Sequence, residues 1–288
     1  MNRLSFLGVP FYSRAEYAGM GKSTEALRKI GIVDLLKAKC DAFTDLGDVP
    51  LPPLLNDSGP KNLRNFDYVS ACSKAVADSA AKINKDDTVF CLGGECVLIM
   101  GILAGLRATF PGEPGLLWLD AHGDFNTPET SPSGFVGGMC LALACGRGPS
   151  IPGVKPSVKE KHVVHFGSRD LDPEESQSLK NSPVKLITSK DIRDRGLEES
   201  LNEAVKELTR TDWILCHLDI DVIDPTSIQA VNFPSKGGLT LDQVKKIVRS
   251  LEDTRRLKGF DLAGYNPLLD PEEESGRRLI RLVSEIFS

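Results

Sequence analysis

Two short stretches of the sequence place carboxylates and a histidine directly after apolar runs. Asp120, His122 and Asp124 follow the apolar part of "LLWLDAHGDFN", and Asp219 and Asp221 follow that of "ILCHLDIDVIDP". Side chains two residues apart in an extended segment point to the same side, so each group can converge on one point. Four carboxylates in a partly buried cleft repel one another unless cations lie between them. The pattern predicts two divalent ions, and this donor set suits Mn²⁺.

Aspartates at the ends of strands also serve as helix caps and turn formers. We assign that role to Asp224 in the "DP" pair at 224–225. Five residues of ligand type in two groups are harder to explain in this way. We therefore favour a metal site for them.

The elements that would bring these groups together alternate between strands and helices. Apolar runs predict strands at 4–11, 88–94, 115–121, 162–168, 184–189, 213–221 and 257–267. Helical patterns cover 23–37, 67–84, 97–109, 137–145, 173–180, 197–209, 240–254 and 272–287. Near-continuous apolar strands separated by amphipathic helices are typical of a parallel sheet covered on both faces. We expect an α/β fold, a three-layer α/β/α sandwich with a mostly parallel central sheet, as a single domain over residues 1–288.

The composition excludes several classes of protein. A net charge of −5 argues against nucleic acid or an anionic membrane as the main partner. No apolar run reaches the roughly 18 residues of a membrane span, and the first residues lack the apolar region of a signal peptide. The seven cysteines show no CxxC spacing and mostly lie in apolar segments, as reduced thiols do. We expect a cytoplasmic protein that acts on a small molecule.

The stretch "GMGKST" at 19–24 resembles a phosphate-binding loop. That motif requires a glycine five residues before the glycine of its Gly-Lys pair, where this chain has Glu16. We expect instead that Ser23 or Thr24 caps the helix that follows.

Taken together, the motifs resemble those of the ureohydrolase family of arginases, agmatinases and formiminoglutamases. The similarity extends over nearly the whole chain and includes "LGVPF", "TEALRKIGIVDLL", "LGGEC", "DAHGDFN", "DIDVIDP" and "GSRDLDPEE". The resemblance implies an arginase-like fold and a metal-dependent hydrolase of non-peptide C–N bonds in linear amidines. It also implies two Mn²⁺ ions and a homo-oligomer, a trimer or a hexamer.

By this resemblance, Asp120 and Asp219 bridge the two manganese ions. Asp124 completes the shell of the first ion, and His122 and Asp221 complete that of the second. A hydroxide bridging the ions attacks the carbon of the guanidine or similar group, and Asp124 is the catalytic residue that orients it.

The first ion in the family also takes a histidine from the Gly-Gly turn, and here that position is Cys96. A thiolate prefers Zn²⁺ or Fe²⁺ to Mn²⁺. Either Cys96 ligates and the metal changes, or this site is weakly occupied. Glu95 is expected to orient a ligand rather than to bind metal.

The resemblance places substrate at two kinds of position. At the reacting end, Gly137, Phe233 and Gly264 replace a histidine, a threonine and the glutamate that pairs with the guanidinium. Glu272, Glu273 and Glu274 are candidates to replace the lost acid. The loop that holds the α-carboxylate and α-amino group is retained, as Asn126, Ser131, Ser133 and Asp172.

These changes disfavour arginine, because a guanidinium would lose an ion pair. The resemblance as a whole implies cleavage of a guanidino, N-hydroxyguanidino, ureido or formimino group on an amino-acid-like substrate. The three replacements permit the less basic of these groups, or an acylated one. The alternative is a catalytically silent arginase-like binding or regulatory protein with one weakened metal site; a small-molecule deacylase ranks last. We expect His217 to be structural, one strand rise too deep, and His162 and His165 to be structural or at the surface.

Overall fold

In the computed structural model, which describes residues 3–287, eight strands form one sheet with the order β2-β1-β3-β8-β7-β4-β5-β6. Every pairing between neighbours is parallel. The strands are β1 (Arg3–Val9), β2 (Ala42–Asp48), β3 (Thr88–Gly93), β4 (Pro114–Leu119), β5 (Val163–Phe166), β6 (Lys185–Ile187), β7 (Trp213–Asp219) and β8 (Leu257–Ala263).

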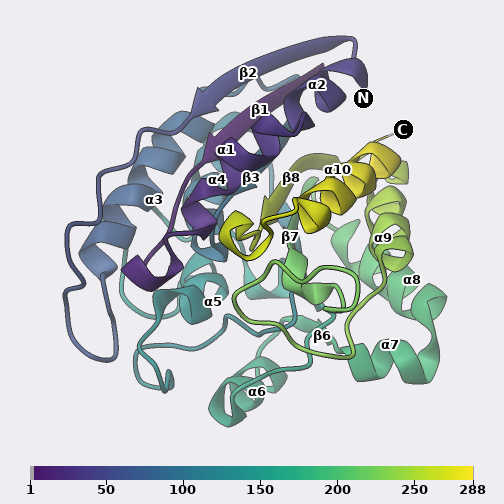
Figure 1. The fold of residues 1–288 in the computed structure, drawn as a ribbon. Coiled ribbons are helices and arrows are strands. Elements are labelled where there is room, and N and C mark those ends of the chain that lie inside the picture. The colour runs from purple at the N-terminus through teal and green to yellow at the C-terminus, as the bar shows by residue number, and fades with distance from the viewer. Residues whose placement is uncertain (1–2, 288) are drawn as a thin grey trace.

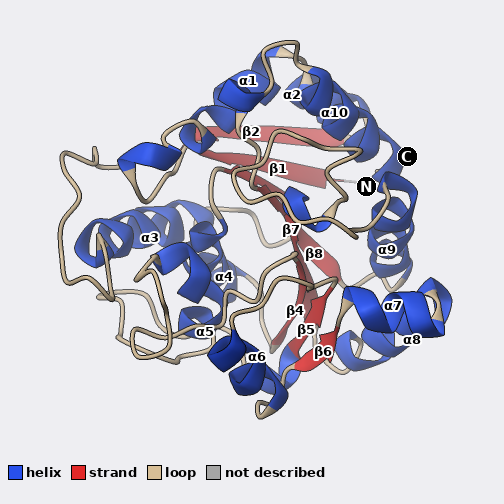
Figure 2. Ribbon diagram, turned by 60° about the horizontal axis from the view of Figure 1, so that its bottom comes forward, coloured by secondary structure: helices blue, strands red, loops and turns tan. Residues whose placement is uncertain are grey.

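Helices cover both faces of this sheet (Figures 1 and 2). They are α1 (Ser23–Lys29), α2 (Ile32–Ala38), α3 (Phe66–Ala80), α4 (Ile99–Thr109), α5 (Cys140–Ala144), α6 (Pro173–Lys180), α7 (Ser189–Arg195), α8 (Leu197–Leu208), α9 (Leu241–Asp253) and α10 (Glu274–Ile286). One core cluster joins the sheet to α3, α4 and α5, and a second joins it to α1, α2, α8, α9 and α10. The three-layer sandwich expected from the sequence is confirmed. Among the described helices, none is long and apolar enough to cross a membrane.

The predicted single helix over 23–37 is two helices. Gly31 adopts φ 103° between α1 and α2, a left-handed conformation that glycine tolerates and that interrupts a helix. The predicted cap is also wrong, because Lys22 precedes the first helical residue. The Ser23 hydroxyl instead donates to the carbonyl of Gly93 over 2.7 Å, and the Thr24 hydroxyl donates to Asp48 over 3.3 Å.

Two elements were absent from the sequence-based prediction. Strand β2 lies at the edge of the sheet and is mostly exposed, so "AFTDLGD" lacks the apolar run of a central strand. Helix α7 is short and polar, but a capping box opens it. The Thr188 hydroxyl accepts from the backbone N–H of Asp191, and the Asp191 carboxylate accepts from the backbone N–H of Thr188.

Removing this cap is expected to weaken α7. Thr188→Ala leaves the backbone N–H of Asp191 without its partner, which costs about 1 kcal/mol of unfolding free energy. Urea denaturation of the wild-type and variant proteins measures the difference. Thr188→Ser keeps the hydroxyl and serves as the matched control, so an equal loss in both variants would contradict the capping role.

The four neighbouring strands β3, β8, β7 and β4 all point the same way and therefore end at the same edge of the sheet. The segments that follow them bring Cys96, Gly264 and Asp120 to this edge, and Asp219 is itself the last residue of β7. Ligands of open α/β sheets bind at the carboxyl ends of the strands. The fold thus gathers residues that are more than a hundred positions apart in the chain.

Candidate metal centre

One group of ligand atoms consists of Asp120, His122 and Asp221, with all three atoms within 4.8 Å of one another. His122 Nδ1 lies 3.0 Å from Asp221 Oδ2 and 3.5 Å from Asp120 Oδ1. The backbone fixes both carboxylates, because the N–H of His122 donates to Asp120 and the N–H of Ala121 donates to Asp221. The predicted convergence of the two strand-end motifs therefore occurs.

A second group contains Cys96, Asp120 and His217, again within 4.8 Å of one another. The Cys96 thiol donates to Asp219 Oδ2 over 2.6 Å, and its sulfur lies 4.0 Å from Asp120 Oδ2. Asp120 belongs to both groups, as a bridging ligand must. Cys96 from the Gly-Gly turn and Asp219 from β7 thus meet at the same place.

Burial and hydrogen bonds act in opposite directions on the pKa values of these groups. Burial raises the pKa values of Asp120 and Asp219, and the neighbouring charge of Asp221 adds to the effect. Burial also raises the pKa of the Cys96 thiol, followed by the charge of Asp219. For His122, burial lowers the pKa, but hydrogen bonds to Asp120 and Asp221 outweigh it and raise the pKa to about 12. Such a cluster attracts a cation.

Asp124 is buried beside these groups and lines the same cavity, but it belongs to neither of the two ligand groups found among the described residues. It has φ 51°, an uncommon conformation for a residue with a side chain. Its Oδ2 accepts from the Cys140 thiol over 3.2 Å, and its carbonyl accepts from the N–H groups of Leu141 and Ala142. The start of α5 therefore fixes Asp124, and no motif in the sequence pointed to the Cys140 thiol.

The cavity over the centre has a volume of 340 Å³. All four residues predicted to hold an amino-acid head group line it: Asn126, Ser131, Ser133 and Asp172. Asn126 Nδ2 donates to Asp172 Oδ2 over 3.0 Å, and Asp172 also opens α6 as its cap. The two serine hydroxyls accept from the backbone N–H groups of Gly134 and Phe135 and so fix the loop.

The opposite wall of the cavity is aromatic. Phe135 and Phe233 line the cavity with tilted rings whose centroids are 5.9 Å apart, and Tyr17, which does not line it, packs edge-on against both at 5.2 and 5.3 Å. A Cβ added at Gly137 would meet the Phe135 ring at 2.2 Å, so this ring fills the space of the missing histidine. Sequence reasoning identified Phe233 and its ring neighbour His122, but not the ring contacts of Phe233 with Tyr17 and Phe135.

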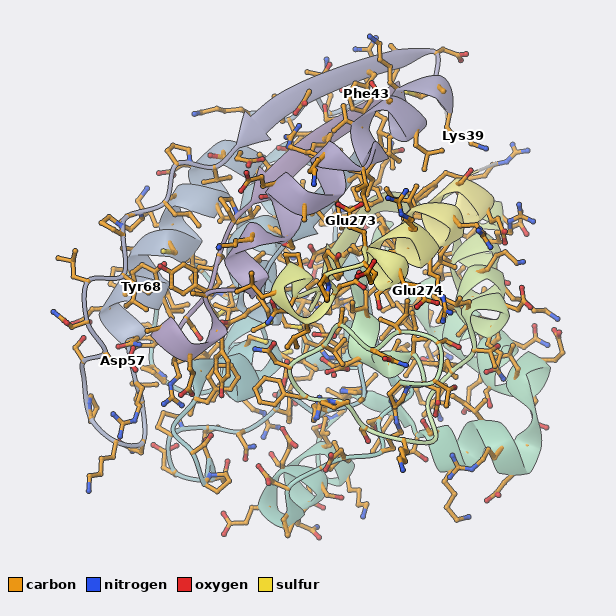
Figure 3. The ribbon with its side chains drawn as sticks, viewed as in Figure 1. Lys39, Phe43, Asp57, Tyr68, Glu273 and Glu274 are labelled. Atoms are coloured by element: carbon orange, nitrogen blue, oxygen red, sulfur yellow. The ribbon has the colours of Figure 1, made fainter. Side chains whose placement is uncertain are left out.

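None of the three glutamates proposed to replace the lost acid lines the cavity. Glu273 pairs with Lys29 over 3.1 Å and with Arg277, while Glu274 pairs with Arg278. Both labelled side chains lie at the amino-terminal end of α10 (Figure 3). In this structure, therefore, none of the three glutamates occupies the place of the lost acid.

The half-buried Arg169 and the buried Glu175 and Glu95 hold backbone segments beside the ligands. Arg169 Nη2 donates to the carbonyl of Asp221 over 2.7 Å, and Glu175 accepts from the N–H of Phe125 over 2.8 Å. Glu95 accepts from the N–H of Ser13 over 2.7 Å, and its second oxygen is buried without a partner. Burial raises the pKa of Glu95 to about 7. Glu95 thus ties the N-terminal loop to the Gly-Gly turn and is not one of the grouped ligands.

The remaining predictions have mixed outcomes. Asp224 accepts from the N–H groups of Gly237 and Gly238, so its loop-forming role is confirmed. His165 is fully buried on β5, and His162 is partly buried near the surface. His217 lies closer to the ligands than sequence reasoning placed it, since one of its ring nitrogens is within 4.8 Å of Cys96 and Asp120.

An α/β/α sandwich with two overlapping groups of thiol, imidazole and carboxylate at its strand ends has the architecture of a binuclear metallohydrolase. The Arginase family model matches residues 2–288, and the chain belongs to this family. The predicted enzyme class is thereby confirmed, a metal-dependent hydrolase of non-peptide C–N bonds. Membership implies a binuclear divalent metal centre, typically of Mn²⁺, and the donor groups described above fit one.

The relatives cover the chain almost completely. Arginase of Bacillus caldovelox is 30% identical and aligns with 100% of this chain and 98% of its own length. Human arginase-1 is also 30% identical, over 96% of this chain and 89% of its own length. The structure of Entamoeba histolytica arginase in complex with L-ornithine has a TM-score of 0.92 and 26% identity, with full coverage of both chains.

Proposed function

We propose that this protein hydrolyses a C–N bond of a guanidino, N-hydroxyguanidino, ureido or formimino group on an amino-acid-like substrate. The observation that carries the proposal is the pair of ligand groups that share Asp120 at the base of one cavity. Four aspartates crowd this place: burial raises the pKa values of Asp120, Asp124 and Asp219, whereas at Asp221 the hydrogen bond and charge of His122 outweigh burial and lower the pKa. Divalent cations relieve the cost of burying these charges.

The residues at the centre would have different roles. Asp120 belongs to both ligand groups, and Asp219 accepts from the Cys96 thiol and from the N–H of Asp221; these two residues would help to hold both ions. When bound, the ions supply hydroxide at neutral pH and a positive field for the charge that develops in the transition state. Asp124, fixed by Cys140 and the start of α5, would accept a hydrogen bond from the attacking hydroxide and orient it.

The walls of the cavity favour a substrate with an amino-acid head and a weakly basic reacting group. Asn126 and Asp172 offer an amide and a carboxylate to the head group. The relative crystallised with L-ornithine binds an amino acid of this kind. At the other end, Phe135 and Phe233 present no carboxylate to pair with a guanidinium. Arginine would therefore bind with the loss of an ion pair.

The test is reconstitution followed by a substrate screen. The protein is loaded with Mn²⁺, Co²⁺ or Zn²⁺ and its metal content is measured. Amino acids with guanidino, N-hydroxyguanidino, ureido or formimino side chains are then assayed for ammonia and urea-type products. Turnover of at least one with a preference over arginine supports the proposal. Failure of all three metals to bind would contradict it.

The head-group assignment predicts a specific kinetic change. Asp172→Asn keeps a residue that can cap α6 but removes the charge offered to the α-amino group. A lost hydrogen bond to a charged group costs about 1.5–3 kcal/mol, so KM is expected to rise about 10- to 100-fold with kcat little changed. Glu174→Gln, exposed in the same turn, is the control and is expected to leave KM unchanged. A fall in kcat alone in Asp172→Asn would refute the assignment.

The assembly into a trimer or hexamer, the cytoplasmic location and the single-domain organisation stay predictions of the sequence. They do not bear on the chemistry proposed for the cavity, because every residue assigned to the site lies in one chain.

A further inference from the structure

His217 is a buried histidine with one ring nitrogen engaged and the other without a partner. Its Nδ1 lies 2.6 Å from Asp261 Oδ2, and both residues are completely buried. Its Nε2 has no hydrogen-bond partner although it is buried. An unpaired polar atom in a protein interior is costly, and it calls for a ligand.

The packing of the sheet fixes the direction of this ring. His217 pairs in register with Trp118 of β4 and with Asp261 of β8. The Trp118 ring stacks on the imidazole with centroids 3.9 Å apart and an interplanar angle of 21°. Asp261 therefore holds Nδ1, and the stacked Trp118 ring restricts rotation of the imidazole.

The imidazole of His217 lies beside the ligands of the metal centre. A ring nitrogen of His217 lies within 4.8 Å of both the Cys96 sulfur and an Asp120 oxygen. Because Nδ1 is engaged by Asp261, Nε2 is the nitrogen available for coordination. A carboxylate that holds one nitrogen of a histidine while the other binds metal is the usual arrangement in metalloproteins.

We propose that His217 is a protein ligand of the first metal ion, with Cys96 and Asp120. This inference rests on the binuclear centre of the proposed function and adds a ligand to it. An imidazole from β7 then takes the place of the histidine that the Gly-Gly turn lacks. Asp261 is a positioning residue that holds its ring.

The donor sets of the two sites would differ in their chemistry. Sulfur, nitrogen and oxygen from Cys96, His217 and Asp120 form a soft site that favours Zn²⁺, Co²⁺ or Fe²⁺. Oxygens from Asp120 and Asp221 with one nitrogen from His122 form a harder site that accepts Mn²⁺. The protein is therefore expected to bind one thiophilic ion and one hard ion when both are supplied.

X-ray absorption of the wild-type protein tests the ligand set directly. At one equivalent of Zn²⁺, sulfur and imidazole nitrogen are expected around the same zinc. Sulfur without imidazole would overturn the role of His217. Imidazole without sulfur would overturn the soft site, because it would place the first zinc at the group that contains His122.

Cobalt titration of variants provides an independent measurement. His217→Asn keeps an amide donor for Asp261 but removes Nε2, and it is expected to lose one of two bound Co²⁺ ions together with the thiolate-to-cobalt absorption. Asp261→Asn is expected to weaken binding at this site by about 10- to 100-fold. His162→Asn, remote from the centre, is the control and should bind as the wild type does.

The outcomes separate the inference from the proposed function. Two Co²⁺ ions with unchanged absorption and affinity in a folded His217→Asn would overturn the inference alone. Absence of metal binding in the wild type would overturn the proposed function as well. If His217→Asn does not fold, the X-ray absorption of the wild-type protein decides.

Discussion

Addition of a divalent metal is expected to raise the melting temperature of the metal-free protein by about 5 °C or more. At a metal concentration a hundred times Kd, binding stabilises the native state by about 2.7 kcal/mol, which corresponds to several degrees for a chain of this size. Differential scanning fluorimetry with and without Mn²⁺, Co²⁺ or Zn²⁺ measures this shift.

Asp219→Asn is expected to abolish most of this metal-induced shift. In the absence of metal, the substitution is expected to raise the melting temperature instead of lowering it. Burial raises the pKa of Asp219, so its charged form opposes folding as the pH rises above the usual range of carboxylates. Without metal at neutral pH, the variant should therefore melt above the wild type. Its amide oxygen can still accept from the N–H of Asp221, as Asp219 does over 2.8 Å.

Asp242→Asn is the control, because this side chain is 86% exposed and distant from the cavity. It is expected to leave the metal-induced shift unchanged. If the wild type shows no shift with any of the three ions, the carboxylates do not form a common cation site.

Gly264→Ala is expected to lose metal binding and about 2–3 kcal/mol of stability. Gly264 has φ 90°, which costs a residue with a Cβ about 1–2 kcal/mol. The added Cβ would also lie 2.4 Å from Oδ1 of Asp219 and would displace this ligand. For the same reason, Gly264→Glu should not create arginine hydrolysis, because the backbone there does not suit a side chain.

Gly138→Ala is the matched control, since it lines the same cavity and a Cβ there would meet nothing within 4 Å. Its urea denaturation midpoint and metal content are expected to equal those of the wild type. Normal metal content in Gly264→Ala would show that Asp219 can move without losing its ligand role.

Most of the fold could be predicted because central strands and covering helices have strong patterns. The strands β3, β4 and β7 are almost completely buried, and their sequences are mostly apolar. The edge strand β2 was not predicted because it is mostly exposed, and its sequence therefore contains polar residues and no continuous apolar run. The break at Gly31 depends on a backbone angle, which hydrophobic periodicity does not report.

The carboxylates and His122 could be predicted because their motifs follow strands of one parallel sheet. His217 could not, since its contacts depend on which strands are neighbours. The sequence shows neither that Asp261 of β8 lies beside it nor that Trp118 of β4 stacks on it. In the same way, the side chain that fills the space beside Gly137 comes from Phe135, and its direction depends on the local backbone.

The order of strands in the sheet has a consequence for how the molecule acquires its structure. Strand β3 pairs with β8, so Val89 lies beside Gly259, and the contact from Cys96 to Asp219 spans 123 positions. Contacts between residues so far apart require closure of long loops, which slows folding. Because β8 lies between β3 and β7 in the sheet, we expect a growing polypeptide to complete the cavity only after the segment carrying β8 has emerged from the ribosome, and to bind metal after that.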